Sequence, residues 1–226
     1  MRKAVIIYGP PGSGKGTQSE LVARTYELIN FDTGQRIREA IYDPAHANDP
    51  IIQRQRTEYY EKGILCEPWW VFELVCKGIR DLSKVSGIVL SGSPRTIYEA
   101  FDEGDRKGEM SILEEVYGKE NIHIFLLKVS SEAVTFRNGK RKVCPICTRG
   151  YLFQKEADLT TCPVCQSPLQ IRTDDDPALM VKRINEFETR TAPIMDGLKK
   201  IGYTVHEIDG EQPPYLVFKD IAKWLS

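Results

Sequence analysis

The segment "KAVIIYGPPGSGKGT" (Lys3–Thr17) decides the fold. Its first part is a short apolar run that predicts a buried strand, and "GPPG" supplies the turn that ends it. The glycines let consecutive backbone N–H groups point toward an anion at the start of a helix, where the helix dipole favours negative charge. Lys15 adds a point charge, and the spacing matches G-x-x-x-x-G-K-[ST] except that Gly16 precedes the hydroxyl residue Thr17. We predict a phosphate-binding loop rather than a glycine-rich turn with an exposed lysine.

Apolar runs of strand length alternate with stretches of helical length along the rest of the chain. Further strands are expected at residues 28–32, 87–92, 122–129 and 203–208. Helices are expected at residues 16–26, from 33, 51–63, 68–82, 131–139, 177–200 with a disturbance at Pro193, and from 213. This alternation predicts an α/β fold with a parallel sheet covered by helices on both faces.

Composition restricts the classes of partner. The chain has 226 residues, 41% of them hydrophobic, and its 31 Lys and Arg against 32 Asp and Glu give a net charge of −1. This composition predicts one globular domain carrying small inserts, and it argues against a general affinity for nucleic acid or membranes, although a local basic cleft stays possible. No apolar run approaches the roughly 20 residues that span a bilayer. The first residues do not resemble a signal peptide, so we expect a cytoplasmic protein.

Four of the six cysteines form two Cys-x-x-Cys pairs between Cys144 and Cys165, whereas Cys66 and Cys76 stand alone. The paired spacing is typical of a tetrahedral zinc site, and four thiolates leave no open coordination position, which indicates a structural metal. Three interpretations stay open from the spacing itself: a nucleic-acid recognition module, a moving part of a nucleotide enzyme, or four cysteines without metal.

Several motifs, taken together and in order, resemble the adenylate kinase family of nucleoside monophosphate kinases. The loop "GPPGSGKGTQ" resembles that family's G-x-P-G-[SA]-G-K-G-T-Q, "DTGQRIR" resembles T-G-D-x-x-R, and "SGSPRT" resembles D-G-F-P-R-T. "EKGILCEP", "FRNGKRKVC", "RTDDD", "VKRINEFETRTAP" and "IDG" follow at matching positions, so the resemblance covers nearly the whole chain.

The resemblance implies a P-loop kinase core with a five-stranded parallel sheet over residues 1–31, 67–139 and 175–226. It also implies a monophosphate-binding insert over residues 32–66 and a zinc-binding lid over residues 140–174. The implied cofactors are ATP, Mg²⁺ and structural Zn²⁺, and the implied substrate is a nucleoside monophosphate. We expect a monomer without nucleic-acid or membrane partners.

The site residues implied by the resemblance fall into four groups. The catalytic cations are Lys15, Arg95, Arg141, Arg172 and Arg183. The ATP-binding residues are Gly12, Ser13, Gly14, Lys15, Gly16, Thr17, Arg137, Arg141 and Tyr151. The residues at the monophosphate site are Thr33, Gly34, Arg38, Ile64, Leu65, Cys66, Gly92, Arg95, Glu99, Arg172 and Arg183. The zinc ligands are Cys144, Cys147, Cys162 and Cys165, and Asp174 and Asp175 either hold neighbouring arginines or form a solvated acidic turn.

Two departures from the family pattern concern magnesium. Ser91 stands in place of the acid of D-G-F-P-R-T, and Gln35 in place of the acid of T-G-D-x-x-R. Magnesium prefers carboxylate oxygens, so its positioning is expected to weaken unless another acid such as Glu67 compensates. The alternative function is a nucleotide-binding sensor with little catalysis. A zinc-ribbon ATPase that depends on nucleic acid is a further alternative, disfavoured by the near-neutral charge.

A third departure concerns the acceptor base. Glu99 aligns with the family glutamine that reads adenine. An ionised glutamate only accepts hydrogen bonds, so it suits a base edge with two donors, as in guanine, better than the N1 lone pair of adenine. The family resemblance favours AMP as the acceptor, and Glu99 makes GMP a possible acceptor. The alternative is that Glu99 lies on a helix surface away from the base.

Overall fold

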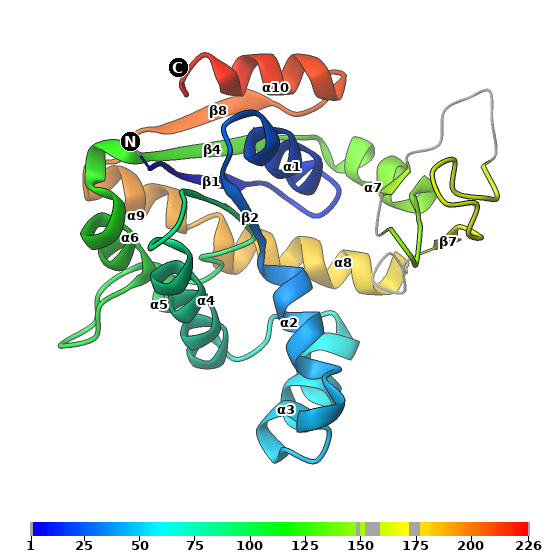
Figure 1. Ribbon diagram of the computed structural model, residues 1–226, viewed down its shortest axis with the longest axis horizontal. Helices are drawn as coiled ribbons and strands as arrows, with labels where there is room; N and C mark the ends of the chain where they lie inside the picture. Colours follow the sequence, from blue (N-terminus) through cyan, green and yellow to red (C-terminus); the bar gives the residue numbers. More distant parts are fainter. Residues whose placement is uncertain (1, 148–149, 152–158, 172–176, 226) are drawn as a thin grey trace.

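A computed structural model describes residues 2–147, 150–151, 159–171 and 177–225. Its centre is a five-stranded parallel sheet with the order β2-β3-β1-β4-β8 (Figure 1). The strands are β1 Ala4–Tyr8, β2 Ile29–Asp32, β3 Ile88–Ser91, β4 Ile122–Lys128 and β8 Val205–Asp209. The predicted α/β fold and its parallel five-stranded sheet are confirmed, with the last strand starting two residues later than expected.

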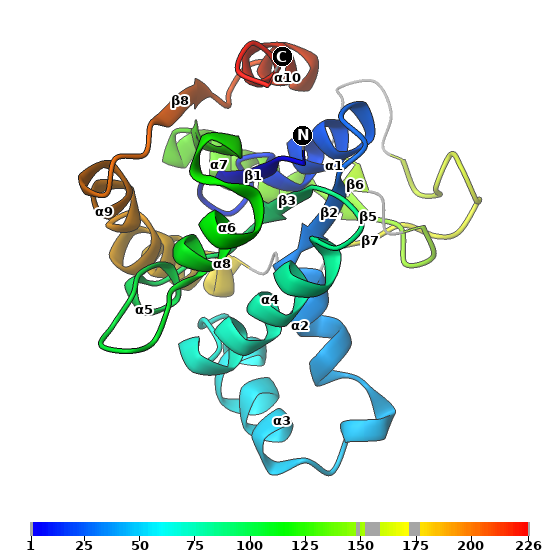
Figure 2. The same ribbon diagram turned by 60° about the vertical axis from the view of Figure 1, so that its left-hand side comes forward.

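Both faces of the sheet are buried, as the apolar strand runs predict. Alternate residues of β1 point to opposite faces: Ile6 joins one hydrophobic cluster and Ile7 the other. One face packs against α1 (Lys15–Thr25) and α10 (Pro214–Ala222). The other is covered by α4 (Pro68–Leu82), α6 (Glu109–Tyr117) and α9 (Ile194–Lys200), an arrangement visible in Figures 1 and 2.

A group of short helices projects from the carboxyl edge of the sheet (Figure 1). It comprises α2 (Thr33–Ile41), η1 (Pro44–His46), α3 (Pro50–Arg54), the π-helical η2 (Gln55–Tyr59) and η3 (Tyr60–Lys62). The single helix predicted for residues 51–63 is therefore three consecutive segments. Asp49 caps its start by accepting from the backbone N–H of Ile51 at 2.8 Å, and Gly63 ends it with a left-handed φ of 72°.

The second projecting segment carries the cysteines. Helix α7 (Ser131–Lys140) leads into a small antiparallel sheet of β5 (Lys142–Val143), β6 (Gly150–Tyr151) and β7 (Gln170–Ile171). The chain returns through α8 (Pro177–Glu186) and the π-helical η6 (Phe187–Thr191) into α9. The disturbance predicted at Pro193 is confirmed, because proline cannot donate the helical hydrogen bond and the preceding turn widens.

The elements not predicted from the sequence include α5 (Ile97–Ala100), α6 and η4 (Lys119–Asn121), as well as η1 and the short strands β5, β6 and β7. Helices α5 and α6 place acidic side chains beneath the site described next. Among the described residues, no helix combines the length and apolarity required to cross a bilayer.

Candidate active site

The phosphate loop has the backbone shape that its glycines allow. Gly12 and Gly14 have φ values of 79° and 95°, which side-chain-bearing residues rarely adopt, and Gly14 is the N-cap of α1. Lys15 Nζ donates to the carbonyl oxygens of Gly9 at 2.7 Å and Pro10 at 2.9 Å. The Ser13 hydroxyl is buried and has no partner within the described part of the chain. The loop is therefore preformed around a space suited to an anion.

Four predicted cations converge at this loop. Burial, together with the charges of Arg95, Arg183 and Arg141, lowers the pKa of Lys15 to about 7, and the charge of Asp32 opposes this shift. This electrostatic coupling requires that the arginines lie close to Lys15, although they come from three separate parts of the chain. Such a concentration of positive charge is costly unless an anion occupies the space between. The predicted residues Arg172, Asp174 and Asp175 lie outside the described residues.

Arg95 lies in the loop that follows β3. Its Nε donates to the carbonyl oxygen of Gly92 at 2.5 Å, and Gly92 has a φ of 87°. A Cβ at Gly92 would lie 2.5 Å from the Arg95 guanidinium, and one at Gly34 would lie 3.9 Å from it. The guanidinium therefore packs on Gly92 and reaches the start of α2. There Arg38 Nε donates to the Tyr60 hydroxyl at 3.0 Å, and the buried Thr33 hydroxyl has no partner among the described residues.

One carboxylate at the sheet edge was missed by the sequence analysis. Asp32 ends β2 directly beside Ser91 at the end of β3, and it accepts from the backbone N–H of Gln35 at 3.0 Å. It is also the one acidic group among the electrostatic neighbours of Lys15 given above. The acids expected at positions 35 and 91 are absent, but Asp32 supplies a carboxylate within the same site.

Glu67, the compensating acid suggested from sequence, is engaged elsewhere. Its carboxylate accepts from Gln55 Nε2 at 2.6 Å and pairs with the Arg54 guanidinium at 3.1 Å. These contacts fix the end of the projecting helices against α4, so Glu67 serves packing of that segment.

The predicted base-side residues line the junction between the projecting helices and the core. Ile64 is 37% exposed, whereas Cys66 is buried, and burial raises the pKa of its thiol to about 12, so the thiol is neutral. The backbone N–H of Leu65 donates to Glu186 at 3.3 Å. Glu99 is only 1% exposed, so the alternative that it is a surface glutamate is wrong.

On the opposite side, Arg137 donates to the carbonyl oxygens of Gly210 at 2.9 Å and Glu211 at 3.3 Å. An open hollow of about 460 Å³ lies beside this contact, lined by Lys128–Ser130, Glu207–Asp209 and Glu211. Asn138, which the sequence analysis missed, donates to the Pro11 carbonyl at 3.4 Å and lies 3.3 Å from Met180 Sδ. It therefore joins the phosphate loop to both helices that carry the cysteine segment.

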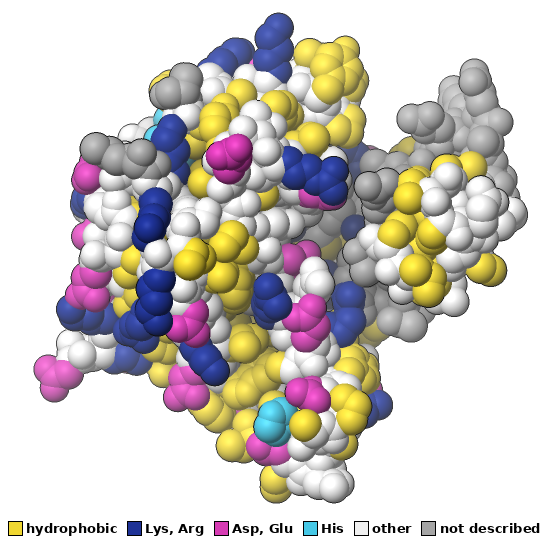
Figure 3. All heavy atoms as spheres, viewed as in Figure 1, with side chains coloured by type: hydrophobic (Ala, Val, Ile, Leu, Met, Phe, Trp, Pro, Cys, Tyr) yellow, Lys and Arg dark blue, Asp and Glu magenta, His cyan; other side chains and the backbone are white. Residues whose placement is uncertain are grey.

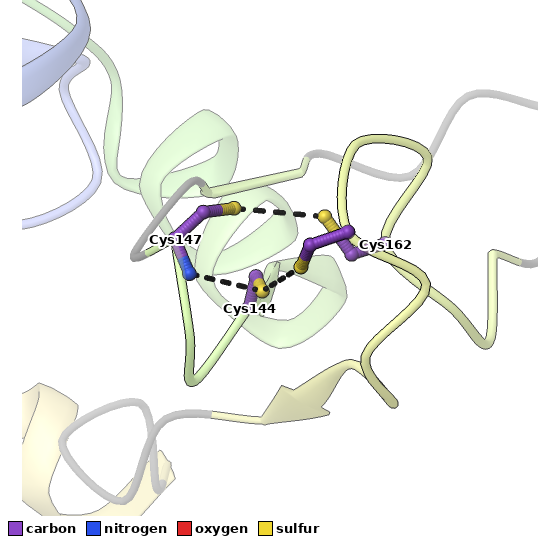
Figure 4. Close-up of side chains that lie close together, drawn as sticks. Cys144, Cys147 and Cys162 are labelled. Carbon is purple, nitrogen blue, oxygen red and sulfur yellow. Dashed lines mark hydrogen bonds between the residues drawn. The ribbon is translucent and has the colours of Figure 1, made fainter.

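The four paired cysteines meet in one cluster (Figure 4). Their sulfurs lie within 4.8 Å of one another, with Cys144 and Cys165 3.3 Å apart and Cys147 and Cys162 3.6 Å apart. All are free thiols. Zinc–sulfur bonds of about 2.3 Å in tetrahedral geometry place sulfurs about 3.8 Å apart, so the cluster fits zinc.

The cysteine segment carries a tyrosine beside the cluster and several exposed hydrophobic side chains. The Tyr151 hydroxyl lies 3.2 Å from Cys162 Sγ and is the main cause that lowers the pKa of that thiol to about 6. Ile146, Val164 and Ile171 are all more than half exposed, and hydrophobic side chains gather on the face of this segment that is seen at the right of Figure 3. A contact of Tyr151 with the ATP base stays a prediction.

A parallel α/β core whose phosphate loop gathers Lys15 and several arginines defines a nucleotide-dependent phosphotransferase. Residues 7–203 match the family model described as adenylate kinase, and the chain belongs to the adenylate kinase family. It is 30% identical to the adenylate kinase of Chlamydia pneumoniae over 96% of this chain and 95% of that protein. It is 32% identical to that of Chlamydia abortus (96% and 94% covered) and 30% identical to that of Kosmotoga olearia (98% and 98% covered). The chain is thus a nucleoside monophosphate kinase, and neither the sensor nor the zinc-ribbon ATPase is favoured.

Proposed function

We propose that the protein transfers the γ-phosphoryl group of MgATP reversibly to AMP. The observation that carries the proposal is the electrostatic convergence of Arg95, Arg141 and Arg183 on Lys15. Phosphoryl transfer needs the two phosphate chains held in line and their charge neutralised, with little covalent chemistry from the protein.

Each cation has a distinct task in this proposal. The backbone N–H groups at Gly12–Thr17 and Lys15 hold the β- and γ-phosphates of ATP. Arg38 and Arg95 hold the acceptor phosphate. The Gly92 carbonyl supports this role of Arg95, because it accepts from Nε and keeps the guanidinium over the loop. Arg141, Arg183 and Arg172 stabilise the charge of the transferred group, where guanidinium forks bind phosphate oxygens in pairs. Arg137 and Tyr151 flank the ATP base.

Closure completes the site. We propose that residues 32–66 and 140–174 close over the two nucleotides and exclude water, which would otherwise accept the phosphoryl group. The bond from the Leu65 backbone N–H to Glu186 and the contacts of Asn138 support this, because they tie both segments to the core at their bases.

Magnesium fits the donors that are present. Thr17 lies in the first turn of α1, and Ser91 and Asp32 are paired at the carboxyl ends of β3 and β2. Bound magnesium supplies charge neutralisation at the β- and γ-phosphates. We propose that Asp32 orients its water shell and so takes over the task of the acids absent at positions 35 and 91.

The four cysteines would hold a structural zinc ion. Because few apolar side chains are buried among the described residues of the cysteine segment, the metal would supply most of its rigidity. All four ligand positions are taken by thiolates, so this zinc takes no part in the transfer.

AMP is favoured as the acceptor because the relatives are adenylate kinases. GMP is the second candidate, because Glu99 stands where the resemblance places the base-reading glutamine and an ionised carboxylate only accepts hydrogen bonds.

Incubation of zinc-loaded protein with MgATP and each of AMP, GMP, CMP and UMP, with measurement of the diphosphates formed, tests the proposal. We expect ADP from AMP as the dominant product. If the wild type prefers GMP and E99Q loses that preference, the acceptor of this enzyme is GMP and not AMP. Tight ATP binding with no diphosphate from any acceptor would contradict the kinase and favour the sensor.

A further inference from the structure

Two carboxyl groups are buried beneath the loop that carries Arg95. Glu99 on α5 is 1% exposed and Glu109 at the start of α6 is fully buried. Neither carboxyl group forms an ion pair within the described residues. Buried acids without such pairing are rare, because desolvation strongly disfavours the charged form.

Each carboxyl group holds a different point of that loop. Glu99 Oε2 accepts from the backbone N–H of Arg95 at 2.7 Å. Both carboxyl oxygens of Glu109 lie 2.9 Å from the Ser93 hydroxyl. On the far side, the Thr191 hydroxyl donates to the carbonyl oxygen of Arg95 at 2.9 Å. The backbone of Arg95 is therefore fixed on both sides by buried polar groups.

The contact between Ser93 and Glu109 indicates where a proton lies. A hydroxyl has one hydrogen, so it can donate to only one of the two Glu109 oxygens. If Glu109 is protonated, its other oxygen donates back to Ser93 and both short contacts are satisfied. Burial and the neighbouring charge of Glu99 raise the pKa of Glu109 well above its ordinary value, and the hydrogen bond from Ser93 opposes only part of this rise.

Glu99 is the better of the two positions for the negative charge. Burial raises its pKa, but the Arg95 backbone N–H, Thr96 and the charges of Arg95 and Arg190 all oppose that shift. The charged or titratable groups that face the pair from the surrounding elements are Tyr8 on β1, Cys66, Cys76 on α4, Arg95 and Arg190. The Tyr8 hydroxyl is buried without a partner among the described residues, so it donates a hydrogen bond to neither acid.

We propose that Glu109 is protonated and neutral while Glu99 is ionised, and that this pair of buried acids positions Arg95 for the acceptor phosphate. Glu99 is the ionised acceptor of the Arg95 backbone N–H, and Glu109 is the neutral partner of Ser93. The positioning role rests on the proposed kinase function, whereas the proton on Glu109 does not. Protonation of Glu99 replaces a charge-assisted hydrogen bond with a neutral one and loosens Arg95.

The proton is tested by infrared difference spectroscopy on the full chain at pH 7, with Glu109→Gln, Glu99→Gln and the control Glu115→Gln. Glu115 is an exposed acid on the same helix, paired with Lys107. We expect the wild type to show the carbonyl stretch of one buried protonated carboxylic acid that disappears in E109Q and persists in E115Q. Absence of that band from the wild type overturns the proposal.

The positioning role is tested by kcat/KM for the acceptor against pH. We expect E99Q to lower acceptor kcat/KM roughly tenfold at pH 7, the effect of losing one charge-assisted bond, and to flatten the acid limb, with the KM for ATP unchanged. E109Q should leave the midpoint of that limb in place, because a neutral amide replaces a neutral acid. An E99Q profile that matches E115Q, or a downward shift of the midpoint in E109Q, overturns the proposal.

Failure of the proposed function is distinguishable from failure of the protonation assignment. If the wild type shows the acid band but transfers no phosphoryl group to any acceptor, the kinase function and the positioning role both fall. The proton on Glu109 would then stand as a structural property.

Discussion

Replacement of Glu109 by glutamine should stabilise the protein at neutral and alkaline pH. The side chain is fully buried and its hydrogen-bond partner is the neutral Ser93 hydroxyl. Burial raises the pKa of Glu109 in the folded protein, whereas in the unfolded chain the group titrates near its ordinary value. Glutamine has nearly the same shape, can exchange hydrogen bonds with Ser93, and carries no proton to gain on folding.

The sign of the effect follows from proton linkage. A carboxyl group whose folded pKa is raised binds more protons in the folded state, so its contribution to stability is full below the unfolded pKa of about 4.3. That contribution declines as the pH rises toward the folded pKa, by about 1.4 kcal/mol per pH unit for one proton. The advantage of E109Q over the wild type should therefore be near zero at pH 4.5 and should grow by about 1.4 kcal/mol per pH unit until the pH reaches the folded pKa.

The assay is urea unfolding of wild type, E109Q and E115Q at half-unit steps from pH 4.5 to 8. The difference between E109Q and wild type should grow steadily with pH, while E115Q, an exposed control, should follow the wild type. A difference that stays constant across this range would refute the assignment of a buried neutral Glu109.

Four further outcomes follow from the site. Asp32→Asn should keep the cap on α2, because asparagine also caps helices, but should lower kcat about tenfold or more at limiting magnesium. Asp32→Ala should in addition lower the free energy of unfolding by about 1 kcal/mol. If the magnesium dependence of kcat is unchanged in both variants, Asp32 does not orient the magnesium water shell. ATP binding at pH 8 should be accompanied by uptake of a proton, because Lys15 with a pKa of about 7 is mostly neutral in the free protein and becomes charged beside phosphate. Calorimetry in two buffers of different ionisation enthalpy measures the proton uptake. Binding without proton uptake would contradict the lowered pKa of Lys15. Treatment of native zinc-loaded protein with a chelator should make the four clustered cysteines reactive toward a thiol reagent, and an unchanged thiol count would mean that no metal protects them. Tyr8→Phe should leave the stability measured by thermal unfolding unchanged or raise it by about 1 kcal/mol, because the hydroxyl removed is buried without a partner among the described residues. A loss of stability of more than about 1 kcal/mol would mean that the Tyr8 hydroxyl forms a hydrogen bond with the acid pair.

The sequence predicts well those features that rest on local pattern. The phosphate loop, the five strands and the interruption near Pro193 each follow from a run of neighbouring residues, and the structure has them within a few positions. The cysteine cluster also follows from spacing alone, because two Cys-x-x-Cys pairs leave few arrangements other than a shared site.

The polar network beneath Arg95 could not be predicted in this way. Ser93 and Glu109 are 16 positions apart, and Tyr8 on β1 lies near enough to Glu109 for their charges to interact, so no local pattern connects the three. The short helices α5 and α6 that bring the acids together have weak sequence signals. Tertiary packing, not local propensity, buries Glu99 and Glu109.

Asp32 was missed for a different reason. It lies three residues before Gln35, outside the T-G-D-x-x-R motif in which the resemblance expects an acid. The pairing of β2 with β3 places the Asp32 carboxylate beside Ser91, which only the register of the sheet reveals.

The most direct test of the account is the balance of products when zinc-loaded protein acts on MgATP and AMP together. The convergence of Arg95, Arg141 and Arg183 on Lys15 predicts transfer without hydrolysis, so two ADP should form for each ATP consumed, with no inorganic phosphate. Release of inorganic phosphate with AMP left intact, or ATP binding without turnover, would contradict the claim that these cations hold two nucleotides for phosphoryl transfer.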